Sequence, residues 1–110
     1  KTTTGQLKCW GENWLGRLGY GDQNVRGDTP GEIASLPDVP FPSGFTDVIP
    51  GYEHTCAILT GDAYCWGNNR YGQLGRGSSS DVWSAAAATP VDLGGHTVVQ
   101  VSVGGEHTCA

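Results

Sequence analysis

The stretch His54–Gly77 reads HTCAILTGDAYCWGNNRYGQLGRG, and both of its halves recur elsewhere in the chain. The second half, CWGNNRYGQLGRG from Cys65, matches CWGENWLGRLGYG from Cys9 with the glycines aligned. The first half extends upstream to PGYEHTCA at 50–57, which matches VGGEHTCA at 103–110. The two offsets are 56 and 53 residues. A glycine-rich unit with a period just over 50 residues and only short β-like runs is typical of repeat architectures with one sheet per repeat.

Composition narrows the class of protein. The 110 residues include 18 glycines and 6 prolines, and the hydrophobic content of 37% is low for a chain that must bury its own core. Turns therefore dominate, and we expect no long helices. The formal net charge of -5 argues against binding to nucleic acid or to an anionic membrane. No apolar run approaches the length of a membrane span, and the N-terminal segment lacks the apolar core of a signal peptide.

Short runs of alternating polarity place the strands. We predict strands at 5–11, 46–51, 53–60, 62–67 and 97–103, and shorter ones at 31–34, 89–93 and from 106 onward. In the run 97–103, Val99, Val101 and Val103 alternate and are expected on one face. Trp14 and Leu18, within the first glycine loop, are expected to pack inward.

Each repeat thus supplies about four short antiparallel strands. Residues 1–57 form repeat one, which needs a preceding HTCA strand, and residues 58–110 form repeat two, whose last strand begins the next unit. A single four-stranded sheet cannot bury both of its faces, whereas sheets packed side by side can. The predicted fold is therefore all-β, with two blades of a β-propeller in an incomplete ring or repeat array.

The two strands around Thr60-Gly61 predict a disulfide. If these two residues form a hairpin turn, Cys56 lies directly opposite Cys65 at a non-hydrogen-bonded position, where the Cα atoms approach to about 4.5 Å. That spacing is compatible with a disulfide, so we predict an intrachain Cys56–Cys65 bond. Four cysteines in a short, loop-rich chain also favour an oxidising compartment.

The other two cysteines each belong to half of the same motif. Cys9 lacks a preceding HTCA strand, and Cys109 lacks a following CWG strand. We expect them to bond to a neighbouring repeat of a longer chain, or to another copy in a head-to-tail assembly. An assembly of that kind closes into a ring or extends as a filament, depending on the rotation between copies.

These motifs resemble the repeat of the regulator of chromosome condensation family. The second copy follows the family pattern at His54-Thr55, Trp66-Gly67, Asn69 and Gly72–Gly75, whereas the first copy departs from it at Trp14 and Arg17. The resemblance implies a β-propeller of four-stranded blades. The founding member of this family is a nucleotide-exchange factor for a nuclear small GTPase, and other members are binding modules or a plant ultraviolet sensor. Cysteine-bearing repeats of this type look like those of secreted proteins.

The recurring residues are interpreted as structural. His54 and His107 could join Cys56 and Cys65 in a metal site, but no fourth ligand has a recognisable spacing, so we expect histidines bonded to the backbone and no metal. We interpret Trp10 and Trp66 as blade packing rather than a light-sensing cluster. The glycines of the two loops could suggest a phosphate-binding loop, but no Lys-Ser/Thr follows them, and we expect turns at Gly16, Gly19, Gly72 and Gly75.

The acidic residues are dispersed singly, and no catalytic set stands out, so we expect no enzyme and no cofactor. The sequence favours an extracellular propeller segment with a structural or protein-binding role, whose partners are other repeats or copies and other proteins. The alternative is a regulatory propeller that promotes nucleotide exchange on a small GTPase, in the cytosol or nucleus, with free cysteines.

Overall fold

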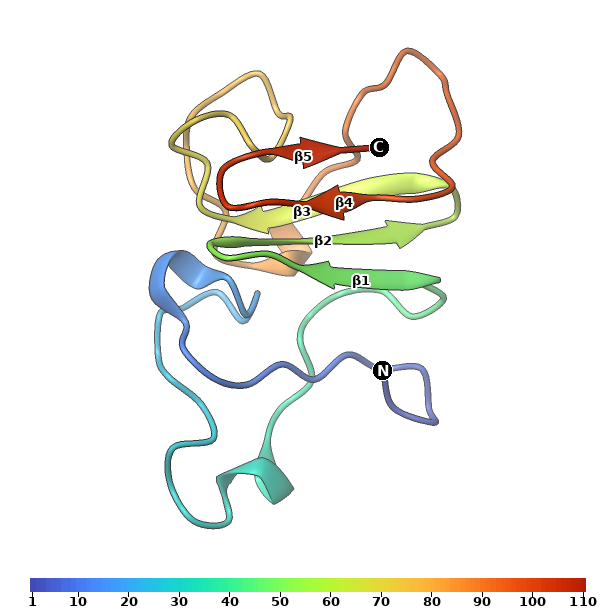
Figure 1. Ribbon diagram of the computed structural model, residues 1–110. Coiled ribbons are helices and arrows are strands. Elements are labelled where there is room, and N and C mark those ends of the chain that lie inside the picture. The colour runs from blue at the N-terminus through green and yellow to red at the C-terminus, as the bar shows by residue number, and fades with distance from the viewer.

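The structure is a computed structural model that describes all residues, 1–110, and measures 45 × 30 × 20 Å along its principal axes. It contains no α-helix. Three short 3-10 helices and five strands follow one another along the chain (Figure 1): η1 (Trp14–Gly16), η2 (Glu32–Ser35), β1 (Asp47–Pro50), β2 (His54–Leu59), β3 (Asp62–Gly67), η3 (Ala85–Ala87), β4 (Ser102–Val103) and β5 (Thr108–Cys109).

The central sheet has the order β1-β2-β3 and is antiparallel. The hairpin of β2 and β3 has the register expected from its two-residue turn, with Leu59 opposite Asp62 and Cys56 opposite Cys65. Thr60 and Gly61 in the turn have φ of 53° and 87°. Positive φ at both central residues is the geometry of the type I′ turn, whose twist matches that of the two strands.

The outer side of each blade is more irregular than predicted. In repeat two, β3 makes isolated bridges to Val82 and Pro90 instead of pairing with a strand at 89–93. In repeat one, the predicted strand 5–11 makes a single bridge, from Gly11 to Arg26. Three residues of the predicted strand 31–34 lie in the 3-10 helix η2, and Gly31 is its N-cap. Proline and glycine explain these errors, because proline has no N–H to donate to the ladder and glycine weakens an extended strand.

The run 97–103 is also shorter as a strand than predicted. Only Ser102–Val103 pairs, with β5, and the alternation fails because Val98 and Val101 are buried while Val99 is 90% exposed. The amide of Val98 donates to the carbonyl of Gly61, which ties this segment to the β2–β3 turn before it reaches β4. The β-branched residues therefore predicted extended backbone correctly here, but not which side chains point inward.

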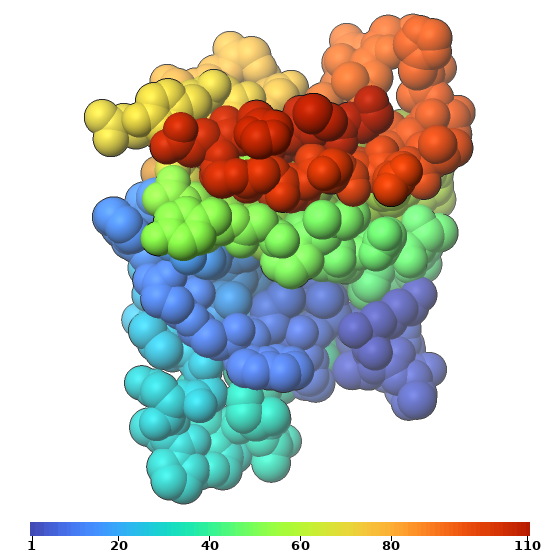
Figure 2. All heavy atoms as spheres, in the orientation of Figure 1, coloured from blue at the N-terminus to red at the C-terminus, as the bar shows by residue number.

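The core lies between the central sheet and the segments that cross it. Within it Phe41 lies among three other aromatic rings, with ring centroids 5.6 Å from Tyr64, 6.0 Å from Phe45 and 5.4 Å from Trp66. The two-stranded β4–β5 sheet packs against β1 and β2. Figure 2 shows the chain arranged in layers, with residues of the first third at one end and the last ten residues near the other. Each successive repeat therefore covers the one before it.

Candidate functional site

The first blade junction is complete. The Thr55 hydroxyl and the Trp66 indole N–H both donate to the backbone carbonyl of Arg17, at 2.9 and 3.1 Å. Trp66 is 0% exposed and packs against Gly19, where an added Cβ would lie 2.7 Å from the indole nitrogen. Only glycine fits this position, since φ there is +86° as well. The threonine of the HT pair and the tryptophan of the CWG motif therefore both hold the glycine loop of the preceding blade.

The second blade junction is half complete. The Thr108 hydroxyl donates to the carbonyl of Gln73 at 2.8 Å, in the same way that Thr55 donates to Arg17. His54 adds a further contact, with its Nε2 atom 2.8 Å from the Thr108 hydroxyl oxygen. No tryptophan donates to Gln73, because no CWG strand follows β5 within these residues.

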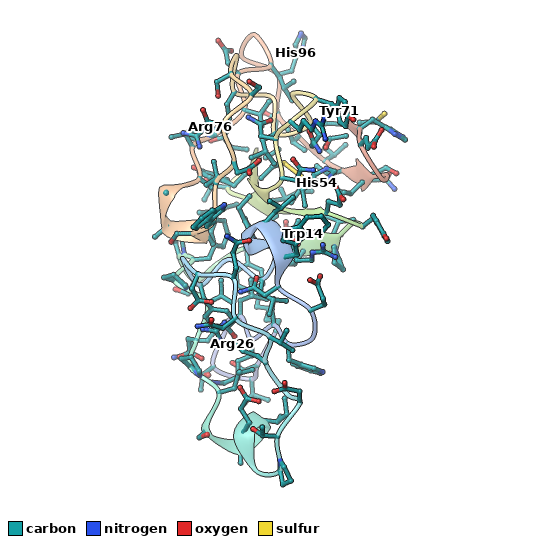
Figure 3. The ribbon with its side chains drawn as sticks, turned by 90° about the vertical axis from the view of Figure 1, so that its left-hand side faces the viewer. Trp14, Arg26, His54, Tyr71, Arg76 and His96 are labelled. Carbon is teal, nitrogen blue, oxygen red and sulfur yellow. A yellow bond between two sulfur atoms is a disulfide. The ribbon has the colours of Figure 1, made fainter.

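His54 is structural in this network, but its partner is the side-chain hydroxyl of Thr108 and not a backbone group as the sequence predicted. Because Thr108 donates its proton to Gln73, the His54 ring must donate from Nε2, which leaves Nδ1 unprotonated and without a partner. Burial, followed by the charge of His107, lowers the pKa of His54, while Glu53 acts in the opposite direction. His54 lies in the interior, whereas His96 is at a loop tip (Figure 3). His107 is exposed.

The glycine loops are each organised by a buried asparagine. The Asn69 side chain accepts from the Leu74 amide at 3.0 Å and donates to the carbonyls of Ser78 and Ser80. Asn13 does the same in repeat one, accepting from Leu18 and donating to Asp22. Sequence reasoning did not assign these asparagines a role, although they recur at the 56-residue offset.

The glycine positions behave as turns. Gly16, Gly19, Gly72 and Gly75 have φ of 72°, 86°, 78° and 66°. No helix begins directly after either loop: η1 is a single 3-10 turn within the first loop, and the short 3-10 helices η2 and η3 begin only at Glu32 and Ala85. The two loops therefore shape the blade junctions.

The cysteines differ in state. Cys56 and Cys65 form a disulfide between β2 and β3, with Cα atoms 4.1 Å apart. Their sulfurs are therefore not available to a metal, and nowhere in the chain do three His, Cys, Asp or Glu side chains gather as ligands. Cys9 and Cys109 are free thiols. Cys9 is partly buried, which raises the pKa of its thiol, and Cys109 is exposed.

Two tryptophans depart from the inward packing that the sequence predicted. Trp10, the counterpart of Trp66, is 61% exposed, because the HTCA strand and the glycine loop that would cover it are not among these residues. Trp14 is 58% exposed at the start of η1, although Leu18 in the same loop is buried as expected. The buried side chains of this loop are Asn13 and Leu18 instead.

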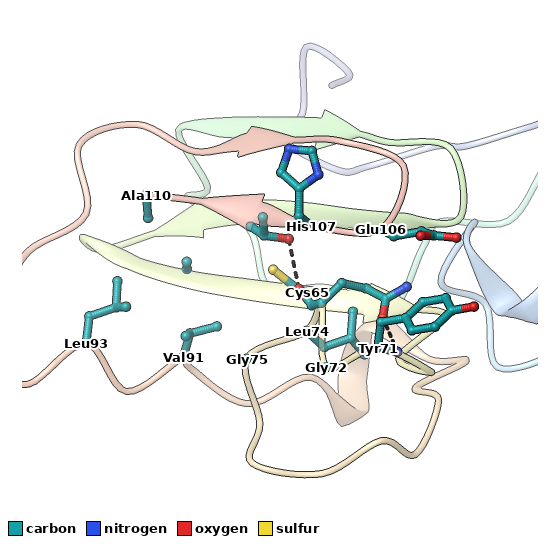
Figure 4. Close-up of a pocket in the computed structure, with 13 residues that line it drawn as sticks. Cys65, Tyr71, Gly72, Leu74, Gly75, Val91, Leu93, Glu106, His107 and Ala110 are labelled. Atoms are coloured by element: carbon teal, nitrogen blue, oxygen red, sulfur yellow. Dashed lines mark hydrogen bonds between the residues drawn. The ribbon is translucent and has the colours of Figure 1, made fainter.

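A groove of about 350 Å³ lies beside β5 (Figure 4). Its walls are Thr108 and Ala110 on one side, the glycine loop with Gln73 and Leu74 below, and Val91 opposite. Gln73 is only 5% exposed, yet its side-chain nitrogen Nε2 has no hydrogen-bond partner. A buried donor left unpaired costs about 1–3 kcal/mol, so the groove favours a ligand that brings an acceptor.

The same residues are covered at the first junction. His54, Thr55, Cys56 and Ala57 are all buried, whereas in the second HTCA copy His107, Cys109 and Ala110 are exposed. The candidate site is therefore the edge of β5 together with this groove.

No helix in the structure is long and apolar enough to cross a membrane.

Comparison with known proteins agrees with this geometry. The profile of the Regulator of chromosome condensation (RCC1) repeat matches residues 4–58 and 60–110, and the chain belongs to this family of β-propeller repeats. It is 35% identical over 104 residues to the human E3 ubiquitin-protein ligase HERC2, covering 94% of this chain and 2% of that protein. It is 34% identical over 108 residues to the ultraviolet-B receptor UVR8 of Arabidopsis thaliana, covering 97% of this chain and 23% of the receptor.

Among solved structures, Prp20p from Saccharomyces cerevisiae matches with a TM-score of 0.73 at 20% identity, covering 97% of this chain and 26% of Prp20p. This likeness establishes the fold, a β-propeller segment of two repeats. The chain spans at most about a quarter of each of these relatives.

Proposed function

We propose that this chain is a non-catalytic, extracellular β-propeller segment with a structural or protein-binding role, and that it binds an extended strand at the edge of β5. Neighbouring repeats of a longer chain, other copies of this chain and other proteins could each supply that strand. The Cys109 thiol, exposed at the same edge, would then face the counterpart of Cys65, and a thiol oxidant of the oxidising compartment would take up two electrons and two protons as the two thiols form a disulfide.

The observation that carries this proposal is the half-built second junction. Thr108 already holds Gln73 as Thr55 holds Arg17, and the space that Trp66 fills at the first junction is an open groove at the second. An edge strand with unpaired backbone groups beside an apolar groove is the arrangement that accepts an added strand.

The extracellular assignment is supported by the cysteines. The Cys56–Cys65 disulfide joins adjacent strands, and such bonds persist mainly in oxidising compartments. Alkylation of the native protein without reductant, followed by mass analysis, tests the assignment. Two alkylated cysteines, Cys9 and Cys109, are expected before any intermolecular bond forms, and four alkylated cysteines would contradict it.

A peptide titration tests the strand-binding role. The peptide carries residues 62–68 with Cys65→Ser, because this segment fills the equivalent place in the complete blade. The matched control peptide also carries Trp66→Ala. We expect the first peptide to bind, and the control to bind at least about tenfold more weakly, since a buried tryptophan dominates contacts of this kind. Equal binding of both peptides, or none of either, would contradict the role.

The second candidate is a regulatory propeller acting on a small GTPase. It is favoured by the structural likeness to Prp20p, whose structure is described together with its binding to Gsp1p and histones. Acceleration of nucleotide release from a nuclear small GTPase by this chain, together with reduced thiols at Cys56 and Cys65, would support this candidate over the extracellular one.

A further inference from the structure

We propose that the groove beside β5 binds the Leu7–Glu12 segment of a second copy of this chain, with the Trp10 indole on the Gln73 carbonyl. The inference rests on the proposed strand-binding function and names its occupant. Residues 1–11 lie beyond β1 on one side of the molecule, and β5 lies on the opposite side (Figures 1 and 2). The segment of one copy is therefore directed to the groove of another.

The first junction supplies the template. There, two donors share the carbonyl of Arg17: the Thr55 hydroxyl and the Trp66 indole. At the second junction the carbonyl of Gln73 has Thr108 and lacks the indole. Trp10 occupies the position of Trp66 in the motif and is the exposed tryptophan that carries the missing donor.

The backbone of the segment is free on the side that β5 would pair with. The Tyr20 hydroxyl accepts from the amide of Cys9 at 3.2 Å and donates to its carbonyl at 2.9 Å. The backbone N–H and C=O groups of Lys8 and Trp10, which point the other way, make no hydrogen bond. In the template register, Trp10 pairs with Thr108 and Lys8 with Ala110, as Trp66 pairs with Thr55 and Tyr64 with Ala57. A carbonyl of the incoming strand can also serve the unpaired Nε2 of Gln73.

The docking is reciprocal, because β5 enters a second groove on the other copy. This groove has a volume of about 400 Å³ and lies beside Cys9 and Trp10, with Val48 and Thr55 in its wall. His54 donates to Thr108 across the second junction. By the same geometry, His107 of one copy donates to Thr55 of the other.

One contact of the template is unfavourable in the docked pair. At the open end of the β2–β3 hairpin, Asn68 donates to the carboxylate of Glu53. The docked counterparts are Glu12 and Glu106, two carboxylates, and only Arg17, 3.0 Å from Glu12, offsets their repulsion. Glu12→Asn restores the template pair, and it also keeps the local turn, since Asn68 accepts from the Arg70 amide as Glu12 does from Trp14. This substitution should tighten self-association.

Sedimentation velocity over a concentration series tests the inference. All variants carry Cys9→Ser and Cys109→Ser, so that only non-covalent association is measured. We expect reversible association with species larger than a dimer, because a head-to-tail contact leaves both ends open. Trp10→Ala should weaken the association at least about tenfold. Trp14→Ala, an equally exposed tryptophan outside the docked segment, should leave it unchanged, and Glu12→Asn should tighten it about threefold or more.

Two results would overturn the inference. The first is a monomer at every concentration, for both the parent chain and Glu12→Asn. The second is self-association that Trp10→Ala and Trp14→Ala weaken equally. If the residue 62–68 peptide still binds in either case, the strand-binding function stands and the occupant is a neighbouring repeat or another protein. If the peptide also fails, the proposed function fails with it.

Discussion

The shared carbonyl of Arg17 makes the first blade junction testable by a double-mutant cycle. Thr55→Val removes the hydroxyl donor with little change of shape, and Trp66→Phe removes the indole donor while keeping an aromatic ring. Either variant leaves one donor on the carbonyl. The double variant leaves none, and the junction excludes the water that could replace them, because Trp66 is fully buried.

The magnitudes follow from the number of hydrogen bonds lost. Thr55→Val removes one bond and should lower the free energy of unfolding by about 1 kcal/mol. Trp66→Phe removes one bond and some buried ring volume, so a loss of about 2–3 kcal/mol is expected. In the double variant the orphaned carbonyl adds about 1–2 kcal/mol beyond the sum of the two single losses. The loss of packing in Trp66→Phe is also present in the double variant, so it cancels when the coupling energy is calculated.

Urea denaturation, followed by far-ultraviolet circular dichroism, measures all four free energies of unfolding. Equal denaturant slopes for the four proteins are needed for the comparison. Additivity within about 0.3 kcal/mol would refute the reasoning, because residues that do not share a partner behave in that way.

Three further predictions concern single residues. Asn69→Ala removes three hydrogen bonds of the second glycine loop and should lower the free energy of unfolding, measured in urea, by about 2–4 kcal/mol. Asn24→Ala, at an exposed position, should change this free energy by no more than about 0.5 kcal/mol, and equal losses would contradict the role of Asn69. The folded state lowers the pKa of His54 from 6.5, so the stability that neutral His54 contributes is present above pH 6.5 and is lost as the pH falls below 6.5. His54→Gln should flatten this pH dependence of the melting temperature, and an unchanged slope would contradict the prediction. Arg26 lowers the pKa of Asp22 from 3.8 to about 2, so stability should decline as pH falls from about 4 towards 2, and less steeply in Asp22→Asn; identical acid denaturation curves would show that the pair is not formed.

The hairpin was the most predictable part of the fold. Thr60 and Gly61 lie between two runs of β-forming residues, and a two-residue turn fixes the register of every pair that follows. The pairing of Cys56 with Cys65 could therefore be worked out from the sequence.

The outer strands could not be predicted in the same way. A valine run such as 97–103 indicates extended backbone, but the exposure of Val99 depends on where the neighbouring β2–β3 turn ties the chain. The exposure of Trp10 likewise depends on which strand covers it, and no local pattern encodes that. Trp14 shows that a large apolar residue in a glycine loop need not be buried inside that loop.

The blade junction was only partly visible in the sequence. The repeated HT and CWG motifs marked the residues that meet, but not that Thr55 and Trp66 both donate to one backbone carbonyl in the loop of the preceding blade. The buried roles of Asn13 and Asn69 were not predicted, because asparagine is usually exposed. Their recurrence at the same motif position was the available signal.

Exchange of the tryptophan indole protons with deuterium, followed by NMR, tests the packing of the repeats as propeller blades most directly. Trp66 is fully buried and its indole donates to Arg17, whereas Trp10, Trp14 and Trp83 are exposed. We predict one slowly exchanging indole proton, assigned to Trp66 by its loss in Trp66→Phe, and three that exchange rapidly. Exchange of the Trp66 proton as fast as that of Trp10 would mean that the blade junction does not form.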